Sequence, residues 1–155
     1  MKLYLVRHGT PVPKEKNPDK PLSDEGRKEV ERVAAFMKKA GVAVHTVFHS
    51  GKTRARETAQ IMASKLQPDK EVLEKQGLSP LDSVKGIAHE IEESERDIMM
   101  VGHLPHLSRL VSLLTAGTET PTVVSFPPGG VVCLCPAEEE KDWAVAWMLA
   151  PDIVT

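Results

Sequence analysis

The sequence begins MKLYLVRHGT (residues 1–10), and the apolar run LYLV within it passes directly into a cation and an imidazole. A short apolar run bounded by polar and turn-forming residues is typical of a buried strand, which we place over residues 2–7. Arg7 and His8 then stand at the C-terminal end of that strand. Partners elsewhere in the chain indicate what these two side chains do there.

The chain has the size and composition of one globular domain. It has 155 residues, of which 41% are hydrophobic and 27% charged, so we expect a single domain over residues 1–155. The formal net charge of −2 disfavours a nucleic-acid coat or a polybasic membrane binder. No apolar stretch reaches the roughly 18 residues of a membrane span, and no secretory leader is visible. We therefore expect a cytoplasmic protein that binds neither nucleic acid nor membrane.

The two cysteines lie in the segment VVCLC. Residues two apart on a strand point to the same face but are poorly placed for a disulfide, and a CxC pair alone is a weak metal signal. We therefore expect Cys133 and Cys135 to be reduced thiols in a cytoplasmic protein, with no bound metal.

Apolar runs alternate with amphipathic helical patterns along the chain, which is typical of an α/β fold. The expected strands cover residues 2–7, 46–49, 71–73, 98–101, 131–135 and 143–148. The expected helices start near Ser23, Lys52, Ser83 and Pro105. Ser23 is a favourable N-cap and Pro105 a favourable first-turn residue. The loop AEEEKD joins the last two strands, so we expect this end to be antiparallel.

Chemically active side chains gather at one edge of this predicted sheet. Arg7 and His8 end the first strand. Arg54 lies in the first turn of the helix after the second strand, and His103 follows the fourth. Ligands of open α/β sheets bind outside the carboxyl ends of the strands, where helix N-termini add positive dipole ends. Two guanidiniums and two imidazoles at this edge predict a phosphate site, because the Arg fork matches two phosphoryl oxygens.

The same residues offer a nucleophile for phosphoryl transfer. The chain has no Walker A loop and no cysteine in a phosphate-binding loop. A neutral His8 can attack phosphorus and form a phosphohistidine, which water then hydrolyses. Simpler explanations exist for each residue. RHG occurs by chance, His103 can cap the next helix, Arg54 can be an exposed helix residue, and paired histidines can bind zinc.

Three segments together resemble a known family. LVRHGTP at the first strand, SGKTRARETA (50–59) and VGHLPHL (101–107) are similar to the signatures of the histidine phosphatase superfamily, in its phosphoglycerate-mutase-like branch. The short chain and the HLP form of the second histidine motif are most similar to the SixA type of phosphohistidine phosphatase. The resemblance implies a three-layer α/β/α fold with a mixed, mostly parallel sheet.

The resemblance also implies roles for the site residues. His8 would be the phosphorylated nucleophile, and neither a metal nor another cofactor would be required. The expected reaction is hydrolysis of phosphohistidine in a signalling or phosphocarrier protein. The residues implied to bind the phosphate are Arg7, Gly9, Arg54, His103 and Leu104.

Two positions depart from the family pattern. Ser50 is followed by Gly51 where relatives usually have Ser-Pro, and Thr10 follows RHG where an acidic residue is common. Because Gly lacks the fixed φ of Pro, we expect a looser start of the helix after Ser50. Thr10 and Ser50 are expected to flank the substrate.

The general acid of larger relatives, a Glu after the third strand, has no clear counterpart. Glu74 and Asp82 are the nearby carboxylates. Asp82 is a candidate to flank the substrate, although we expect it to cap the following helix. His106, in the first turn of the helix after His103, can face the rim of the pocket, but we expect it to be exposed to solvent.

The segment between the third and fourth strands is too short for a lid. Lids close over small substrates and expel water, so a short segment favours a shallow site that admits a phosphorylated protein side chain. Lys14, Lys16 and Lys20, after the first strand, can steer an acidic phosphoprotein or simply be solvated. We expect a monomer acting on phosphohistidine. The alternatives are a phosphatase of small phosphomonoesters and a catalytically idle phosphoprotein-binding module.

Overall fold

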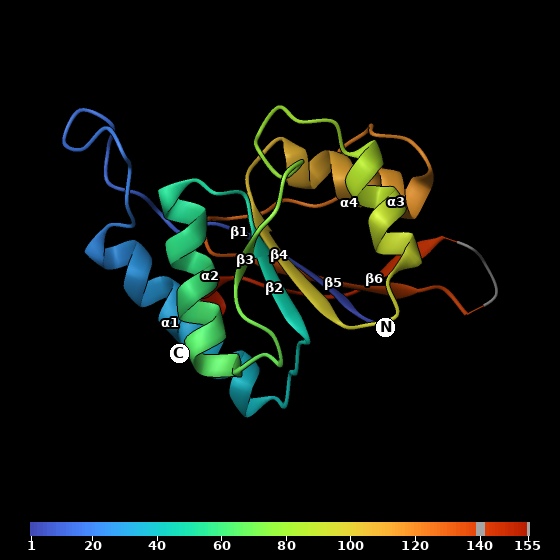
Figure 1. Ribbon diagram of the computed structural model, residues 1–155, viewed down its shortest axis with the longest axis horizontal. Helices are drawn as coiled ribbons and strands as arrows, with labels where there is room; N and C mark the ends of the chain where they lie inside the picture. The colour runs from blue at the N-terminus through green and yellow to red at the C-terminus, as the bar shows by residue number, and fades with distance from the viewer. Residues whose placement is uncertain (139–141, 155) are drawn as a thin grey trace.

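A six-stranded sheet forms the middle layer of the protein. The computed structural model describes residues 1–138 and 142–154. The strands lie in the order β3-β2-β4-β1-β5-β6 (Figure 1). Their bounds are β1 Leu3–Arg7, β2 Thr46–His49, β3 Leu73–Glu74, β4 Ile98–Gly102, β5 Val131–Pro136 and β6 Trp143–Leu149.

Strand β1 joins a parallel half of the sheet to an antiparallel half. It pairs in parallel with β4, where Leu3 lies opposite Ile98 and Arg7 opposite Gly102, and it is antiparallel to β5. Strand β2 is parallel to both β3 and β4, whereas β6 is antiparallel to β5. The mixed, mostly parallel sheet and its antiparallel C-terminal pair confirm the sequence-based prediction.

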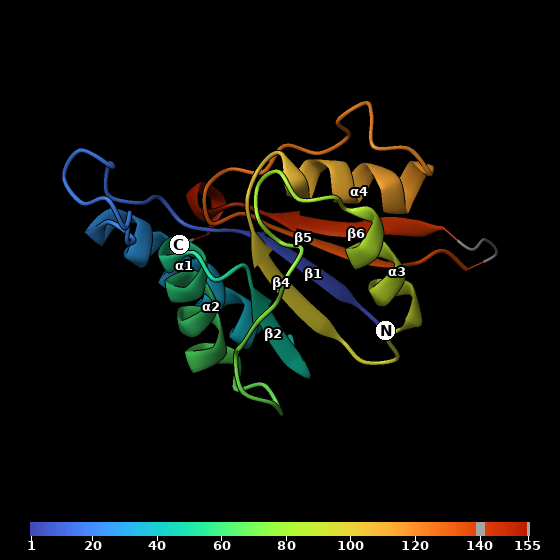
Figure 2. The same ribbon diagram turned by 45° about the horizontal axis from the view of Figure 1, so that its top comes forward.

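Helices cover both faces of the sheet and complete the three layers (Figures 1 and 2). α1 and α2 pack on the face that holds Tyr4 and Val6, and α3 and α4 on the face that holds Leu3 and Leu5. Successive residues of β1 therefore enter opposite cores, as expected of a strand buried on both faces. The helix bounds are α1 Asp24–Lys39, α2 Thr53–Leu66, α3 Lys85–Glu93 and α4 His106–Ala116, with a final 3₁₀ turn at Pro151–Ile153.

An N-terminal cap and a buried apolar stripe define helix α1. The Ser23 hydroxyl caps its N-terminus by accepting a hydrogen bond from the Gly26 N–H at 3.0 Å. Such a cap satisfies a backbone donor that has no partner inside the helix. The buried stripe consists of Val30, Val33, Ala34 and Met37, as the spacing predicts.

A few boundaries differ from those expected. β3 forms at Leu73–Glu74 rather than at 71–73, and α3 begins at Lys85 rather than near Ser83. The loop AEEEKD, expected between the last two strands, lies partly outside the described residues. Both cysteines are free thiols; Cys133 is buried and Cys135 half-buried. Within the described chain, no helix combines the length and apolar character needed to cross a bilayer.

Truncation of a buried side chain in β1 should destabilise the whole domain. Leu5 is fully buried and lies between Met100 of β4 and Val132 of β5. We expect Leu5→Ala to lower the free energy of unfolding by about 3 kcal/mol, because it leaves a cavity in the central strand. Urea unfolding followed by circular dichroism measures this change. Leu81→Ala is the control, since Leu81 is 81% exposed and its truncation should cost less than about 0.5 kcal/mol. Equal losses in the two variants would contradict the assignment of Leu5 to the core.

Candidate active site

The strand register brings the predicted site residues to one edge of the sheet. β1, β4 and β2 are neighbours and parallel, so their carboxyl ends meet. His8 directly follows β1, and its N–H donates to the Gly102 carbonyl at the end of β4. His103 directly follows β4, and Arg54 lies in the first turn of α2 after β2. Sequence reasoning therefore placed these side chains at the correct edge.

His8 is held in one tautomer. Its Nδ1 lies 2.8 Å from the Gly9 carbonyl oxygen. A carbonyl only accepts hydrogen bonds, so Nδ1 carries the proton and Nε2 keeps its lone pair. His8 is 9% exposed, so that lone pair lies in a largely buried setting.

His103 lies beside His8. The two ring centroids are 4.9 Å apart and the ring planes are tilted by 52°. His103 is buried, and its Nε2 shares a 2.6 Å hydrogen bond with the Ser50 hydroxyl. The Ser50 hydroxyl therefore contacts His103, and its expected place beside a substrate stays a prediction.

Burial keeps both imidazoles neutral at pH 7. Burial is the main reason that the pKa of His8 falls to about 4; the hydrogen bond to the Gly9 carbonyl opposes the shift, and the guanidiniums of Arg54 and Arg7 and the ammonium of Lys20 contribute to it. Burial likewise lowers the pKa of His103 to about 3, with added repulsion from His8 and Arg54. The positive charges of the neighbouring side chains disfavour protonation of either imidazole, because the added proton would bring a further positive charge to the site.

Within residues 1–138 and 142–154, no carboxylate pairs with the two arginines of the site. In the described part of the chain, neither Arg7 nor Arg54 forms an ion pair with Asp or Glu. The Nη1 of Arg7 donates to the Phe126 carbonyl at 2.7 Å, which fixes the guanidinium. Its buried Nε has no hydrogen-bond partner. Unpaired guanidiniums beside neutral imidazoles suit a doubly charged anion such as a phosphoryl group.

Gly9 permits a close approach between the RHG turn and α1. A Cβ at this position would lie 2.8 Å from a methyl carbon of Val30. The Gly9 N–H donates to the Thr58 hydroxyl at 3.1 Å, and that hydroxyl donates to the Arg54 carbonyl at 2.8 Å. Buried Thr58, which sequence analysis missed, thus ties the turn after His8 to the turn that carries Arg54. The phosphate-binding roles of Gly9 and Leu104 stay predictions.

The Ser50–Gly51 turn has a specific backbone conformation. Gly51 has a φ of +95°, which Pro cannot adopt and other residues rarely do. The Glu74 side chain fills the space that a Cβ at position 51 would need. The Gly51 N–H donates to Nδ1 of His49 at 3.0 Å. The glycine that was expected to loosen the start of α2 is therefore held by two neighbouring side chains.

Two expectations about flanking residues are wrong. The Asp82 carboxylate accepts from the Ser79 N–H at 2.9 Å, so it closes a turn instead of capping α3. His106 is fully buried rather than exposed to solvent. Burial lowers the pKa of His106, while Gly77 and Asp82 raise it, which locates the 77–82 segment beside this ring. That segment covers the first turn of α4, and sequence periodicity alone does not reveal such a covering loop.

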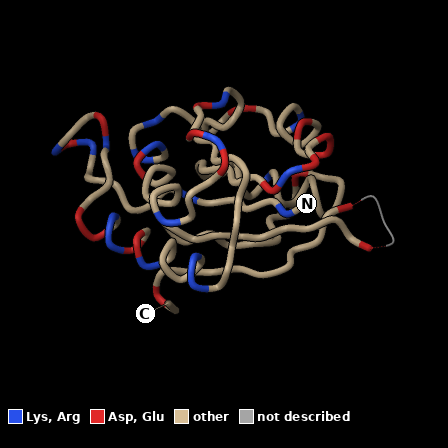
Figure 3. The backbone as a smooth tube through the Cα atoms, turned by 60° about the horizontal axis from the view of Figure 1, so that its bottom comes forward, with Lys and Arg blue, Asp and Glu red and all other residues tan. Residues whose placement is uncertain are grey.

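Thr10 and the loop lysines follow the RHG stretch along the chain. The Thr10 carbonyl accepts hydrogen bonds from the backbone and the hydroxyl of Ser23, which anchors the end of the RHGT stretch. Lys20 is near enough to lower the pKa of His8. Lys14 and Lys16 are exposed on the same loop. Acidic residues alternate with these lysines, as the charge-coloured tube shows (Figure 3).

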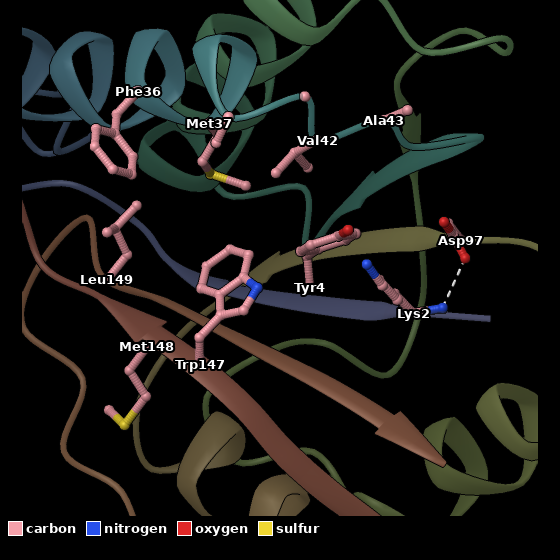
Figure 4. Close-up of a pocket in the computed structure, with 12 residues that line it drawn as sticks. Lys2, Tyr4, Phe36, Met37, Val42, Ala43, Asp97, Trp147, Met148 and Leu149 are labelled. Atoms are coloured by element: carbon pink, nitrogen blue, oxygen red, sulfur yellow. Dashed lines mark hydrogen bonds between the residues drawn. The ribbon is translucent and has the colours of Figure 1, made fainter.

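The described residues hold no cluster of metal-binding side chains, and a cavity lies away from this edge. Among the described residues, no group of three or more His, Cys, Asp or Glu side chains is arranged to hold a metal ion. A cavity of about 470 Å³ lies instead near the opposite ends of the strands, between α1 and β6. Lys2, Tyr4, Asp97 and Trp147 line it, with apolar residues of α1 above them (Figure 4).

An α/β sheet with two imidazoles and two unpaired guanidiniums at its carboxyl edge defines a protein of the histidine phosphatase class. The chain belongs to the histidine phosphatase superfamily (branch 1), whose family model matches residues 3–97. His103 lies beyond the matched residues, so its place in the site rests on the geometry described above.

Known structures and sequences are similar to this chain over most of its length. The protein histidine phosphatase SixA complexed with tungstate has a TM-score of 0.86 at 21% identity, covering 98% of each chain. Phosphoserine phosphatase from Entamoeba histolytica, as a mutant with phosphoserine, has a TM-score of 0.71 at 18% identity, covering 97% of each chain. An uncharacterized protein of Picosynechococcus sp. is 28% identical over 142 residues, which is 86% of this chain and 84% of that protein.

The suppressed pKa of His8 should make folding sensitive to acid. His8 titrates near 6.5 when unfolded and near 4 when folded, so the unfolded state binds more protons between these values. The free energy of unfolding should therefore fall as pH falls, by about 2 kcal/mol from pH 6.5 to 5 for this group. His8→Asn should remove that part of the slope in urea unfolding. His89→Asn, at an exposed histidine, is the control and should keep the wild-type slope. Parallel slopes in all three proteins would rule out a suppressed pKa.

Proposed function

We propose that this protein is a metal-independent protein phosphohistidine phosphatase that works through a phosphohistidine on His8. The observation that carries the proposal is the state of the His8 ring. Its Nδ1–H is bound to the Gly9 carbonyl, and its free Nε2 lies beside His103 and two unpaired arginines. A neutral imidazole beside fixed cations suits attack on a phosphoryl group, whose charge the cations stabilise.

In the first step, the Nε2 lone pair of His8 attacks phosphorus. A P–N bond forms to His8 while the bond from phosphorus to the leaving nitrogen of the substrate breaks. Arg7 and Arg54 stabilise the charge that spreads over the three equatorial oxygens. The electron pair of the broken bond stays on the substrate's imidazole, whose other ring nitrogen takes a proton from solvent, so the ring leaves neutral and depends little on a strong acid in the enzyme.

In the second step, water attacks the phosphorus of phosphorylated His8. A P–O bond forms, the P–N bond to His8 breaks, and its electron pair returns to Nε2. Inorganic phosphate is released and the neutral imidazole is restored. His103, beside His8, is placed to hold a phosphoryl oxygen through both steps.

The short connection after β3 supports a protein substrate. The segment from β3 to α3 spans only residues 75–84, and Gly77 and Asp82 within it lie beside His106 of α4. With no long insertion in this segment to close over a small molecule, the site suits a phosphorylated side chain that projects from another protein. The proposed partner is a phosphohistidine-bearing signalling or phosphocarrier protein, encountered by a monomer in the cytoplasm.

A phosphatase of small phosphomonoesters is the second candidate. The similarity in fold to a phosphoserine phosphatase favours it. A catalytically idle phosphoprotein-binding module is disfavoured, because a binding role requires cations but not the free Nε2 of His8.

The test is turnover of a phosphohistidine-bearing protein, quenched at alkaline pH and analysed by mass spectrometry. We expect acid-labile phosphate on His8 of the wild type, because alkali preserves the P–N bond. His8→Ala should carry none and should lose at least about a hundredfold in rate. His89→Ala is the matched control and should turn over normally, since its ring is exposed on α3.

Two outcomes would overturn the proposal. Full turnover by His8→Ala would remove His8 as the nucleophile. A kcat/KM for phosphoserine or a sugar phosphate that exceeds the value for the phosphoprotein would favour the small-molecule candidate.

A further inference from the structure

His49 is a buried histidine that the reaction steps above do not use. It is the last residue of β2 and is 6% exposed. Its Nδ1 accepts a hydrogen bond from the Gly51 N–H at 3.0 Å. The ring therefore holds the backbone of the turn between β2 and α2.

This hydrogen bond depends on the glycine. Pro has no N–H to donate, so the Ser-Pro pair common in relatives could not make it. Gly51 supplies the donor and also the φ of +95° that directs it at His49. The Glu74 side chain packs where a Cβ would otherwise lie, which fills the space left by the missing side chain.

The turn held by His49 carries a contact to the catalytic site. Ser50 lies between His49 and Gly51 in the chain, and its hydroxyl is 2.6 Å from Nε2 of His103. The same hydroxyl accepts a 3.4 Å hydrogen bond from the Lys52 N–H. Rotation of the 50–52 backbone would move the Ser50 hydroxyl and release the His103 ring.

We propose that His49 is a positioning residue of the phosphate site, which fixes the Ser50 turn through Gly51 and thereby orients the His103 ring. The proposal deepens the proposed function and rests on it only for the kinetic measurements. His49 touches neither substrate nor phosphate and acts through the turn alone.

The charge state of His49 decides whether the turn is held. Nδ1 accepts the Gly51 N–H only while it is unprotonated. Burial lowers the pKa of His49, as does Arg56 on α2, whereas Glu74 on β3 raises it. On the other side of the turn, His103 after β4 and Lys52 face it through Ser50. In acid, protonation of Nδ1 should therefore break its hydrogen bond to Gly51 and release the turn in the wild type. A side chain at position 49 that accepts this hydrogen bond but does not titrate should keep the turn in place.

The experiment compares His49→Leu with His49→Asn. Leu fills the space but removes the acceptor, whereas the Asn amide oxygen takes a place similar to that of Nδ1. At pH 7 we expect Leu to lower kcat and the affinity for tungstate about three- to tenfold, as expected for one lost hydrogen bond. Asn should stay within about twofold of the wild type. As the pH is lowered, kcat/KM of the wild type should fall more steeply than kcat/KM of the Asn variant.

His89→Leu is the matched control, because it removes an exposed imidazole from α3. It should leave kcat, tungstate affinity and the pH profile unchanged. A ¹⁵N spectrum should also show a changed His103 Nε2 shift in His49→Leu but not in His49→Asn. Equal behaviour of Leu and Asn in both tungstate affinity and the His103 shift would overturn the proposal.

The measurements distinguish a failure of the proposed function from a failure of the role proposed for His49. If the wild type turns over no phosphoprotein, tungstate affinity and the His103 shift still report on the turn. If turnover is normal but those two measurements are equal in all variants, only the role of His49 fails.

Discussion

The parallel pairing of β1 with β4 is the constraint on which the site depends. It sets Arg7 opposite Gly102, so the residues that follow both strands emerge side by side, with His8 and His103 rings 4.9 Å apart. Alternate residues of β1 enter opposite cores, and both cores are closed by helices. A slip of one residue would exchange the two faces and expel the apolar side chains from their places. Hydrophobic burial thus fixes the positions of charged groups that contribute little to the core themselves.

Burial and unpaired charge act together at the carboxyl edge. Desolvation holds His8 and His103 neutral, and the guanidiniums of Arg7 and Arg54 add to that effect. The same guanidiniums have no carboxylate partner among the described residues. Their positive potential therefore acts on an incoming anion, because no ion pair within the described residues neutralises it. A site of this kind is electrostatically incomplete until an anion binds.

The sheet, its antiparallel end and the meeting of His8, Arg54 and His103 could be predicted from the sequence, because apolar periodicity locates strands and strand ends converge. The burial of His106 could not, since it arises from a covering turn whose path no periodic pattern encodes. The links through Thr58 and His49 were missed for a similar reason. Each is a contact between a side chain and a backbone group, and its partner becomes visible only when φ angles such as that of Gly51 are known.

The short connection between β3 and α3 has a consequence for selectivity under the proposed function. With only a short connection after β3, little chain is available there to contact a substrate beyond its phosphoryl group, and the arginine forks fit free orthophosphate as well as a phosphorylated ring. Discrimination must then come from the protein surface that surrounds the phosphohistidine. It follows that the cellular phosphate pool competes for the same cations, and the fraction of enzyme free to act would follow the phosphate status of the cell.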